Sequence, residues 1–259
     1  METFAGFGDV LKSEYAKLRS LRSTAYTLAA AALFTVVLAA VIGAFVPPRL
    51  SAADRRDVDA VQLGLGGMHL AQVAIGVLGV LAVTGEYGSG TIRTTFSAVP
   101  RRRTVLTAKA VVVAGAAAAV GTASCFGAFY AFEAFLTEDA MSVSLGDPGV
   151  LRAVAGGGLY LAVLALLGLG LGAVLRSSAG ATATLLGLLF VPALLVDLLP
   201  PGGRTTVGPY LPMQAGTQVF VAAPHEAHAL APWTGFAVFS LYAAAALAAG
   251  LVLVTRRDA

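Results

Sequence analysis

The chain has 259 residues, of which 58% are hydrophobic and only 12% are charged, and its formal net charge is +3. About a quarter of the residues in an average soluble domain are charged. A soluble globular protein of this length is therefore excluded, because so few charged residues cannot cover its surface. The single cysteine, Cys125, excludes an internal disulfide framework and a multi-cysteine metal site.

Six apolar runs are each long enough to cross a bilayer, which takes roughly 20 mostly apolar residues per helix. Short alternating strands of the barrel type are absent from the sequence, so helices are the spanning structure that we expect. The sequence therefore predicts one all-α transmembrane domain over residues 1–259. The predicted spans are Ala25–Val46, Leu63–Thr84, Val105–Leu136, Val150–Leu175, Ala179–Leu199 and Trp233–Val254.

Residues 1–23 precede the first span and have an amphipathic pattern. Apolar side chains recur at three- and four-residue steps beside a basic face. This pattern is typical of a helix that lies in the headgroup plane of a membrane. The alternative is a basic flank of the first span with no role of its own. We expect an interfacial helix whose contacts use Phe7, Leu11, Tyr15, Lys17 and Leu18.

Polar residues within the predicted spans are candidates for functional or packing roles. His69 and Gln72 are three residues apart in the second span, where they could hydrogen-bond across helices or line a cavity. Glu133 lies near the outer end of the third span, as an interfacial carboxylate or a group facing a substrate path. His69, Gln72 and Glu133 are therefore candidate pathway residues. Lys109, at the start of the third span, is expected to snorkel to the interface.

The loop at residues 85–104, between the second and third spans, carries the most information. Glycines at positions 85, 88 and 90 permit a tight turn as the chain leaves the membrane. Thr91 could cap a short helix that Pro100 would stop. A short amphipathic helix displayed in this way suits docking into a groove on a soluble partner. Its predicted apolar side consists of Ile92, Phe96 and Val99.

This loop resembles a known family. Glu86, an aromatic residue and a glycine are followed by Gly-Thr-Ile-Arg at positions 90–93, and then by Pro-Arg-Arg at 100–102. The pattern resembles that of bacterial permease subunits of ATP-binding-cassette exporters of the second, six-helix type. The resemblance implies that the loop is a coupling helix seated in a cleft of a cytoplasmic ATPase. Carried over, the coupling residues are Glu86, Gly90, Thr91, Ile92, Arg93, Pro100, Arg101 and Arg102.

The resemblance also implies partners and a function. The chain would form the export path for a hydrophobic or amphiphilic substrate, such as a drug, natural product or lipid. It would pair with a second permease copy, identical or related, and contact membrane lipid but no nucleic acid. ATP and magnesium would bind the partner ATPase, because this chain has no phosphate-loop pattern and no enzyme motif. The alternatives are a non-transporting scaffold or sensor and an ion-coupled carrier, although inverted repeats and midplane carboxylates are not evident.

The segment at residues 200–232, before the last span, begins with a proline- and glycine-rich turn and continues with a mildly apolar stretch at residues 213–222. The family resemblance implies a re-entrant segment that caps the translocation path on the outer side. The alternative is a disordered loop, but the hydrophobicity argues against it. His225 and His228 share a helical face, yet no third ligand is evident, and no metal site is predicted.

The basic residues predict the orientation. With the N-terminus inside, most of them fall in cytoplasmic segments, and few fall in outer loops. We therefore expect a multi-pass protein of the bacterial cell membrane with both termini in the cytoplasm. The predicted inner set is Lys12, Lys17, Arg19, Arg22, Arg93, Arg101, Arg102, Arg103, Lys109, Arg176, Arg256 and Arg257, and the outer set is Arg49, Arg55, Arg56, Arg152 and Arg204.

Overall fold

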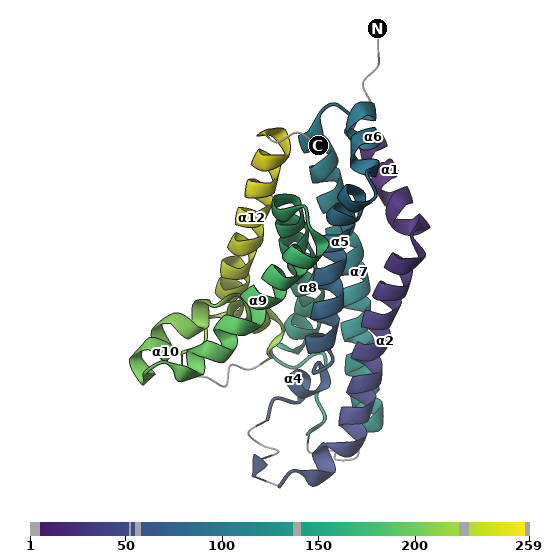
Figure 1. Ribbon diagram of the computed structural model, residues 1–259. Coiled ribbons are helices and arrows are strands. Elements are labelled where there is room, and N and C mark those ends of the chain that lie inside the picture. The colour runs from purple at the N-terminus through teal and green to yellow at the C-terminus, as the bar shows by residue number, and fades with distance from the viewer. Residues whose placement is uncertain (1–5, 52, 55–57, 137–140, 223–227, 257–259) are drawn as a thin grey trace.

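The computed structural model describes residues 6–51, 53–54, 58–136, 141–222 and 228–256. Within these ranges the chain is built from helices and their connections, and no residue lies in a strand (Figure 1). The helices are α1 (Phe7–Ser20), α2 (Arg22–Phe45), η1 (Pro47–Arg49), α4 (Ala60–Gly64), α5 (Met68–Gly88), α6 (Thr91–Ala98), α7 (Arg102–Phe135), α8 (Val150–Leu175), α9 (Ser178–Leu195), η3 (Val196–Leu198), α10 (Pro201–Val207), η4 (Gly208–Tyr210), α11 (Pro212–Thr217), η5 (Gln218–Phe220) and α12 (Pro232–Arg256).

Six helices of the described chain are long and apolar enough to cross a membrane, namely α2, α5, α7, α8, α9 and α12. The all-α, six-span prediction is therefore confirmed. The predicted start of the second span, at Leu63, is wrong. The Asp59 carboxylate accepts hydrogen bonds from the backbone N–H groups of Val61 (2.8 Å) and Gln62 (3.1 Å), and so caps the separate helix α4. The spanning helix α5 begins only at Met68.

Helix α8 is the centre of the bundle and packs against α5, α7, α9 and α12. Its contact with α5 depends on glycines. A Cβ atom added to Gly168 would overlap the carbonyl oxygen of Gly76, and one added to Gly172 would lie 2.9 Å from the carbonyl oxygen of Val80. Small residues let the two backbones approach this closely, which is how helices pack when lipid replaces water.

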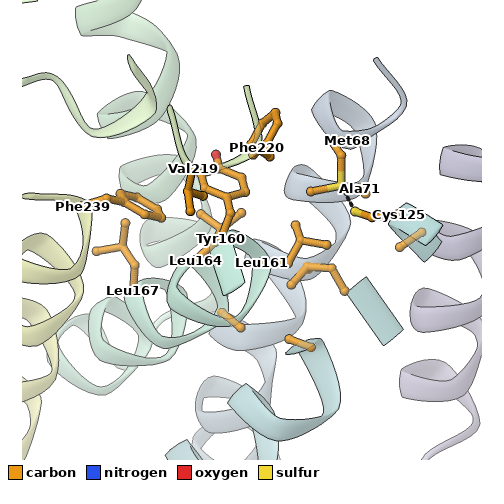
Figure 2. Close-up of a cluster of buried hydrophobic side chains, with 14 of the residues drawn as sticks. Met68, Ala71, Cys125, Tyr160, Leu161, Leu164, Leu167, Val219, Phe220 and Phe239 are labelled. Carbon is orange, nitrogen blue, oxygen red and sulfur yellow. Dashed lines mark hydrogen bonds between the residues drawn. The ribbon is translucent and has the colours of Figure 1, made fainter. Parts of the chain in front are cut away.

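A buried aromatic cluster lies where α8 and α12 meet the segment before the last span (Figure 2). The ring of Tyr160 stacks on Phe239 of α12, with ring centres 5.1 Å apart, and meets Phe220 of η5 edge-on at 5.2 Å. Helices α11 and η5 of that segment pack against α8 and α12, and their Ala215 and Val219 are fully buried, whereas α10 is mostly exposed. Because the described part of residues 200–232 is largely helical, the disordered-loop alternative is wrong for that part.

The two ends of the bundle hold different elements. Helices α1 and α6 and the last turns of α12 lie at one end, while α4 and α10 lie at the other (Figure 1). Contacts between distant segments join the elements of the first end. The Arg102 guanidinium donates a hydrogen bond to the carbonyl oxygen of Val254 in α12 (3.2 Å), and the guanidinium carbon of Arg176 lies 5.0 Å from the ring centre of Tyr87. We call this the α1–α6 end.

Candidate coupling site at the α1–α6 end

Helix α6 begins at a glycine that the backbone requires. Gly90 is the N-cap residue and has φ +72°, in the left-handed region, with open space around it. The sequence suggested Thr91 as the cap, but Thr91 is the first helical residue. Its hydroxyl lies 2.9 Å from that of Ser89. Gly85 and Gly88 belong to α5, which continues to Gly88. The turn thus depends on one glycine and not three.

The two faces of α6 have different surroundings. Ile92 is buried, with 5% of its surface exposed, while Phe96 and Val99 are partly buried, so this apolar side is covered by the chain itself. Arg93 and Ser97 are exposed on the other side. A soluble partner would therefore meet the polar face of α6. The residues that pack beneath Phe96 and Val99 are Val10, Leu11, Val105 and Ala108.

Helix α1 packs along α7 and has two faces of its own. Val10 and Glu14 are buried against the protein, whereas Phe7 and Tyr15 are about half exposed, at 48% and 56%. The predicted apolar stripe therefore points partly outward, as expected for a helix that contacts lipid. Leu11, Lys17 and Leu18, the other members of the predicted set, are partly buried.

Four charged side chains from α1, α5 and α7 form one cluster, which we call the charge cluster: Glu14, Lys17, Glu86 and Lys109. The ammonium group of Lys109 pairs with Glu14 and, at 2.8 Å, with Glu86. The ammonium group of Lys17 lies 2.7 Å from Glu14 and 3.0 Å from Glu86, and it also donates to the Thr95 hydroxyl of α6 at 3.2 Å. The cluster joins four helices at one point.

Lys109 corrects a sequence prediction. We expected it to snorkel to the interface, but only 7% of its side chain is exposed, and both carboxylates of the cluster surround it. A buried cation is held in this way only when its hydrogen bonds are satisfied. Removing one partner from such a buried group costs far more than breaking an exposed ion pair. The cluster therefore fixes α1 against α5 and α7.

The surroundings of Lys17 favour its charged form. Burial alone lowers the pKa of the Lys17 ammonium group, but hydrogen bonds and Coulombic attraction from Glu14 and Glu86 outweigh burial and raise that pKa above its ordinary value. Lys17 therefore remains an ammonium group throughout the neutral pH range.

The end of the loop is tied down as well. The guanidinium carbon of Arg102 lies 5.3 Å from the ring centre of Phe96, within the range of a cation–π contact. Pro100 and Arg101 are exposed between α6 and α7. Of the residues that the resemblance implied, the structure thus brings Glu86, Ile92 and Arg102 into contacts within the chain. It leaves Gly90, Thr91, Arg93, Pro100 and Arg101 on the surface.

The candidate pathway residues lie apart from this site. His69 is exposed on α5, and Gln72 is buried and accepts a hydrogen bond from the Tyr160 hydroxyl. Glu133, near the end of α7, accepts hydrogen bonds from the Ser142 hydroxyl (2.7 Å) and the Val143 backbone N–H (3.1 Å). Gln72 thus takes part in helix packing, and Glu133 holds the start of the following loop.

The metal hypothesis concerned residues 225–228, and residues 225–227 lie outside the described part of the chain. In the part that the structure describes, no group of three or more histidine, cysteine, aspartate or glutamate residues is arranged to hold a metal ion.

Sequence reasoning missed the role of Glu14. A glutamate in an amphipathic helix is expected to face water, yet Glu14 is 4% exposed. One signal could have found it. Glu14 is four residues after Val10 and three before Lys17, so the three side chains share one face of α1.

Six helices long and apolar enough to span a membrane, with a short polar-faced helix displayed at one end, define an integral membrane protein. The chain matches the model of the ABC-2 family transporter protein over residues 10–259, and it belongs to that family. No curated protein matches it. Family membership makes the chain a membrane subunit of the ATP-binding-cassette transporter class and implies a separate ATPase as its partner.

Proposed function

We propose that this chain is the permease subunit of an ATP-binding-cassette exporter and that its ATPase docks on the exposed face of α6. The charge cluster is the observation that carries this proposal. It ties α6, through Thr95, to α1, α5 and α7, so a force applied to α6 reaches two spanning helices through short contacts. A loop without such ties could bind a partner but would not move the bundle.

In this mechanism, ATP binds the partner ATPases and draws them together. Each ATPase displaces the α6 helix to which it is bound. The buried ion pairs resist separation of α1 from α5 and α7, because an unpaired charge at that depth is costly. The helices at this end therefore move as one body, and the permease switches between inward- and outward-open states.

The export path is proposed to lie between two permease copies and to be lined by α5 and α9. Helix α9 packs only lightly within one chain and exposes apolar side chains, among them Phe190, Val191 and Leu194. Large apolar surfaces of this kind face either lipid or a partner. An apolar lining suits a hydrophobic or amphiphilic cargo such as a drug, natural product or lipid.

The orientation proposed for this function places the α1–α6 end in the cytoplasm of a bacterial cell, where an ATPase could reach it. The basic residues of α1, of the α6 region and of the α8–α9 junction are the support, because positive charge accumulates on the cytoplasmic side. The outer segment, including α10 and α11, would then cap the path from outside, as a re-entrant segment.

The test uses Arg93, an exposed cation on the proposed docking face, and Arg49, an exposed arginine at the opposite end, as its matched control. The full chain is co-expressed with a cytoplasmic ATP-binding-cassette ATPase of the same genome, and the complex is purified. A charge-assisted contact contributes about 1.5–3 kcal/mol, so we expect Arg93→Ala to weaken ATPase binding about tenfold or more. Arg49→Ala should leave binding unchanged.

Three results would contradict the proposal in distinct ways. Equal losses of ATPase binding in Arg93→Ala and Arg49→Ala would exclude α6 as the docking site. Transport by vesicles that hold this chain alone, at the rate seen with the ATPase, would indicate an ion-coupled carrier. A bound ATPase whose hydrolysis moves no substrate would indicate a scaffold or sensor.

A further inference from the structure

A cavity lies beside the charge cluster and is lined by residues of α1, α2, α5, α6 and α7. Its volume is about 730 Å³, within the range of roughly 300–1,000 Å³ that is typical of small-molecule sites. It reaches from α6, which is not one of the candidate spans, to residues well inside α5 and α7, which are. The cavity therefore joins the polar α1–α6 end to the membrane-spanning part of the bundle.

The wall of the cavity changes chemistry along its length. Leu78 and Leu81 of α5 and Val112 of α7 line one part. Hydroxyl-bearing residues of α6 and of the first turn of α2, together with Glu86, line the other. Leu78 and Glu86 are eight positions apart on α5, which at 1.5 Å per residue is about 12 Å along the helix. The cavity thus offers an apolar length and a polar end to one amphiphilic molecule.

The charge cluster leaves no unpaired charge for an occupant of the polar end. Its two carboxylates are balanced by two ammonium groups, of which that of Lys17 is the most exposed, at 36% of the side chain. A cationic headgroup would meet this ammonium group first. An anionic headgroup would find the three donors of Lys17 already bound to Glu14, Glu86 and Thr95. Because burying an unpaired ion costs far more free energy than burying a neutral polar group, the headgroup that fits is uncharged.

The hydroxyls that line the polar end suit an uncharged headgroup. A hydroxyl group has one donor hydrogen and two acceptor lone pairs. Among the described residues, the hydroxyls of Ser23 and Thr24 have no hydrogen-bond partner, and since Ser23 is exposed and Thr24 only partly buried, an occupant can reach both. These two hydroxyls therefore donate as well as accept. Other hydroxyls of the wall already donate to backbone carbonyls and offer lone pairs, namely those of Ser20, Thr27, Ser89 and Thr94.

We propose that this cavity binds an uncharged amphiphile whose headgroup carries hydroxyl groups, of the acylglycerol type. The headgroup exchanges hydrogen bonds with the hydroxyls of Ser23 and Thr24, and the alkyl chain lies along Leu78, Leu81 and Val112. Two sources share this chemistry: an acylglycerol of the surrounding bilayer, and an uncharged amphiphile in transit. The site itself does not depend on the proposed export; only the second source does.

The test compares three probes that share a twelve-carbon chain and differ in headgroup charge. They are monododecanoylglycerol, dodecyltrimethylammonium and dodecyl sulfonate, and the charges of the last two do not change with pH. The full chain is reconstituted into nanodiscs of phosphatidylcholine, whose headgroup carries no hydroxyl group. Binding of each probe is measured against empty nanodiscs, so that partition into the lipid is subtracted.

Two variants fill the apolar part without touching the charge cluster. Val112→Phe places a ring in the cavity from α7, and Ala82→Phe does so from α5. Val111→Phe is the matched control, because Val111 is 51% exposed on α7 and does not line the cavity. A filled variant whose thermal midpoint in detergent matches that of Val111→Phe shows that lost binding is not lost folding.

We expect monododecanoylglycerol to bind the wild type and Val111→Phe at least about tenfold more tightly than either charged probe, because a buried group left without its partner costs about that factor or more. Both filled variants should lose this binding by a similar factor. Equal binding of the three probes, or tighter binding of a charged one, would overturn the proposal. So would full retention of monododecanoylglycerol by the filled variants.

A further variant tests the headgroup contacts and does not depend on filling the cavity. The double change Ser23→Ala and Thr24→Val removes both hydroxyls that are free to donate and keeps the shape of the wall. We expect it to weaken monododecanoylglycerol binding about fivefold or more, since each neutral hydrogen bond contributes about that factor. Thr107→Val is the control, because Thr107 is exposed on α7 and does not line the cavity. Unchanged affinity in the double variant would overturn the proposed headgroup site.

The two sources are separated by the lipid that the protein retains from its native membrane. Acylglycerol enriched in the wild type and in Val111→Phe, but not in Val112→Phe, assigns the site to a bilayer lipid. Selective binding of monododecanoylglycerol without such enrichment assigns it to an amphiphile in transit. Either result supports the uncharged-amphiphile site, and neither depends on whether the ATPase docks on α6.

Discussion

The two ends of this bundle are held together by different forces. At the α1–α6 end, four charged side chains from α1, α5 and α7 form buried ion pairs. At the opposite end, Tyr160, Phe220 and Phe239 pack as a close aromatic cluster. The side chain of Arg152 there donates hydrogen bonds to the backbone carbonyls of Val219 (3.2 Å) and Ala222 (3.1 Å).

This difference bears on which end moves. Close packing of rings and glycines has few alternative arrangements, because interiors are packed at crystal-like density. Ion pairs between long lysine and glutamate side chains instead hold α1, α5 and α7 to one another, so that these helices can shift as one body. The charge cluster therefore suits an end that transmits movement, and the aromatic cluster suits an end that holds its shape. Three changes would sharpen or break this comparison.

The largest effect is expected at Glu14. Glu14→Ala leaves Lys109 buried with one carboxylate fewer and removes a partner of Lys17. We expect the free energy of unfolding to fall by about 3 kcal/mol, the lower end of the range for breaking a buried pair, because Glu86 remains. The measurement is unfolding in mixed micelles. Lys12→Ala, an exposed change on the same helix, is the control and should alter stability by less than about 0.5 kcal/mol. If Glu14→Ala lowered the free energy of unfolding as little as Lys12→Ala does, the charge cluster would not stabilise the α1–α6 end.

An intermediate effect is expected at Tyr160. Tyr160→Phe keeps the ring packing but leaves the buried amide oxygen of Gln72 without its donor. We expect a loss of about 1–2 kcal/mol in the free energy of unfolding. Tyr242→Phe is matched to it, since that hydroxyl donates to the carbonyl of Tyr210 at an exposed site, and should cost less than about 0.5 kcal/mol. Equal losses of unfolding free energy in the two variants would show that the buried hydrogen bond of the Tyr160 hydroxyl adds no more stability than an exposed one.

The smallest effects concern the turn before α6, and they have opposite signs. Gly90→Ala places a side chain at φ +72° and should destabilise the protein by about 1 kcal/mol. Gly85 lies within α5 with open space around it, so Gly85→Ala should stabilise the protein by about 0.5–1 kcal/mol. Unfolding of both variants in the same micelles gives the comparison. If both variants changed the free energy of unfolding in the same direction, the turn would not depend on Gly90 alone.

Much of the fold could be predicted, and the reasons are local. The spans follow from runs of apolar residues, since the bilayer admits only segments that bond their own backbone. Helix α6 follows from residues 91–98 and the proline after them. The errors are local as well. The second span was started too early because hydropathy does not register the cap at Asp59. Thr91 was taken for the cap because a positive φ at Gly90 is not visible in a sequence.

By itself, the sequence determined the membrane location, the six spans and the position of the displayed helix, because hydropathy and turn chemistry act over a few neighbouring residues. Only the tertiary structure decided what Glu14 and Lys109 do. They are 95 positions apart, and each looks like an ordinary interfacial charge until α1 folds against α7. A buried ion pair depends on which helices meet, so tertiary packing made two separate charges into a link between α1 and the spanning helix α7.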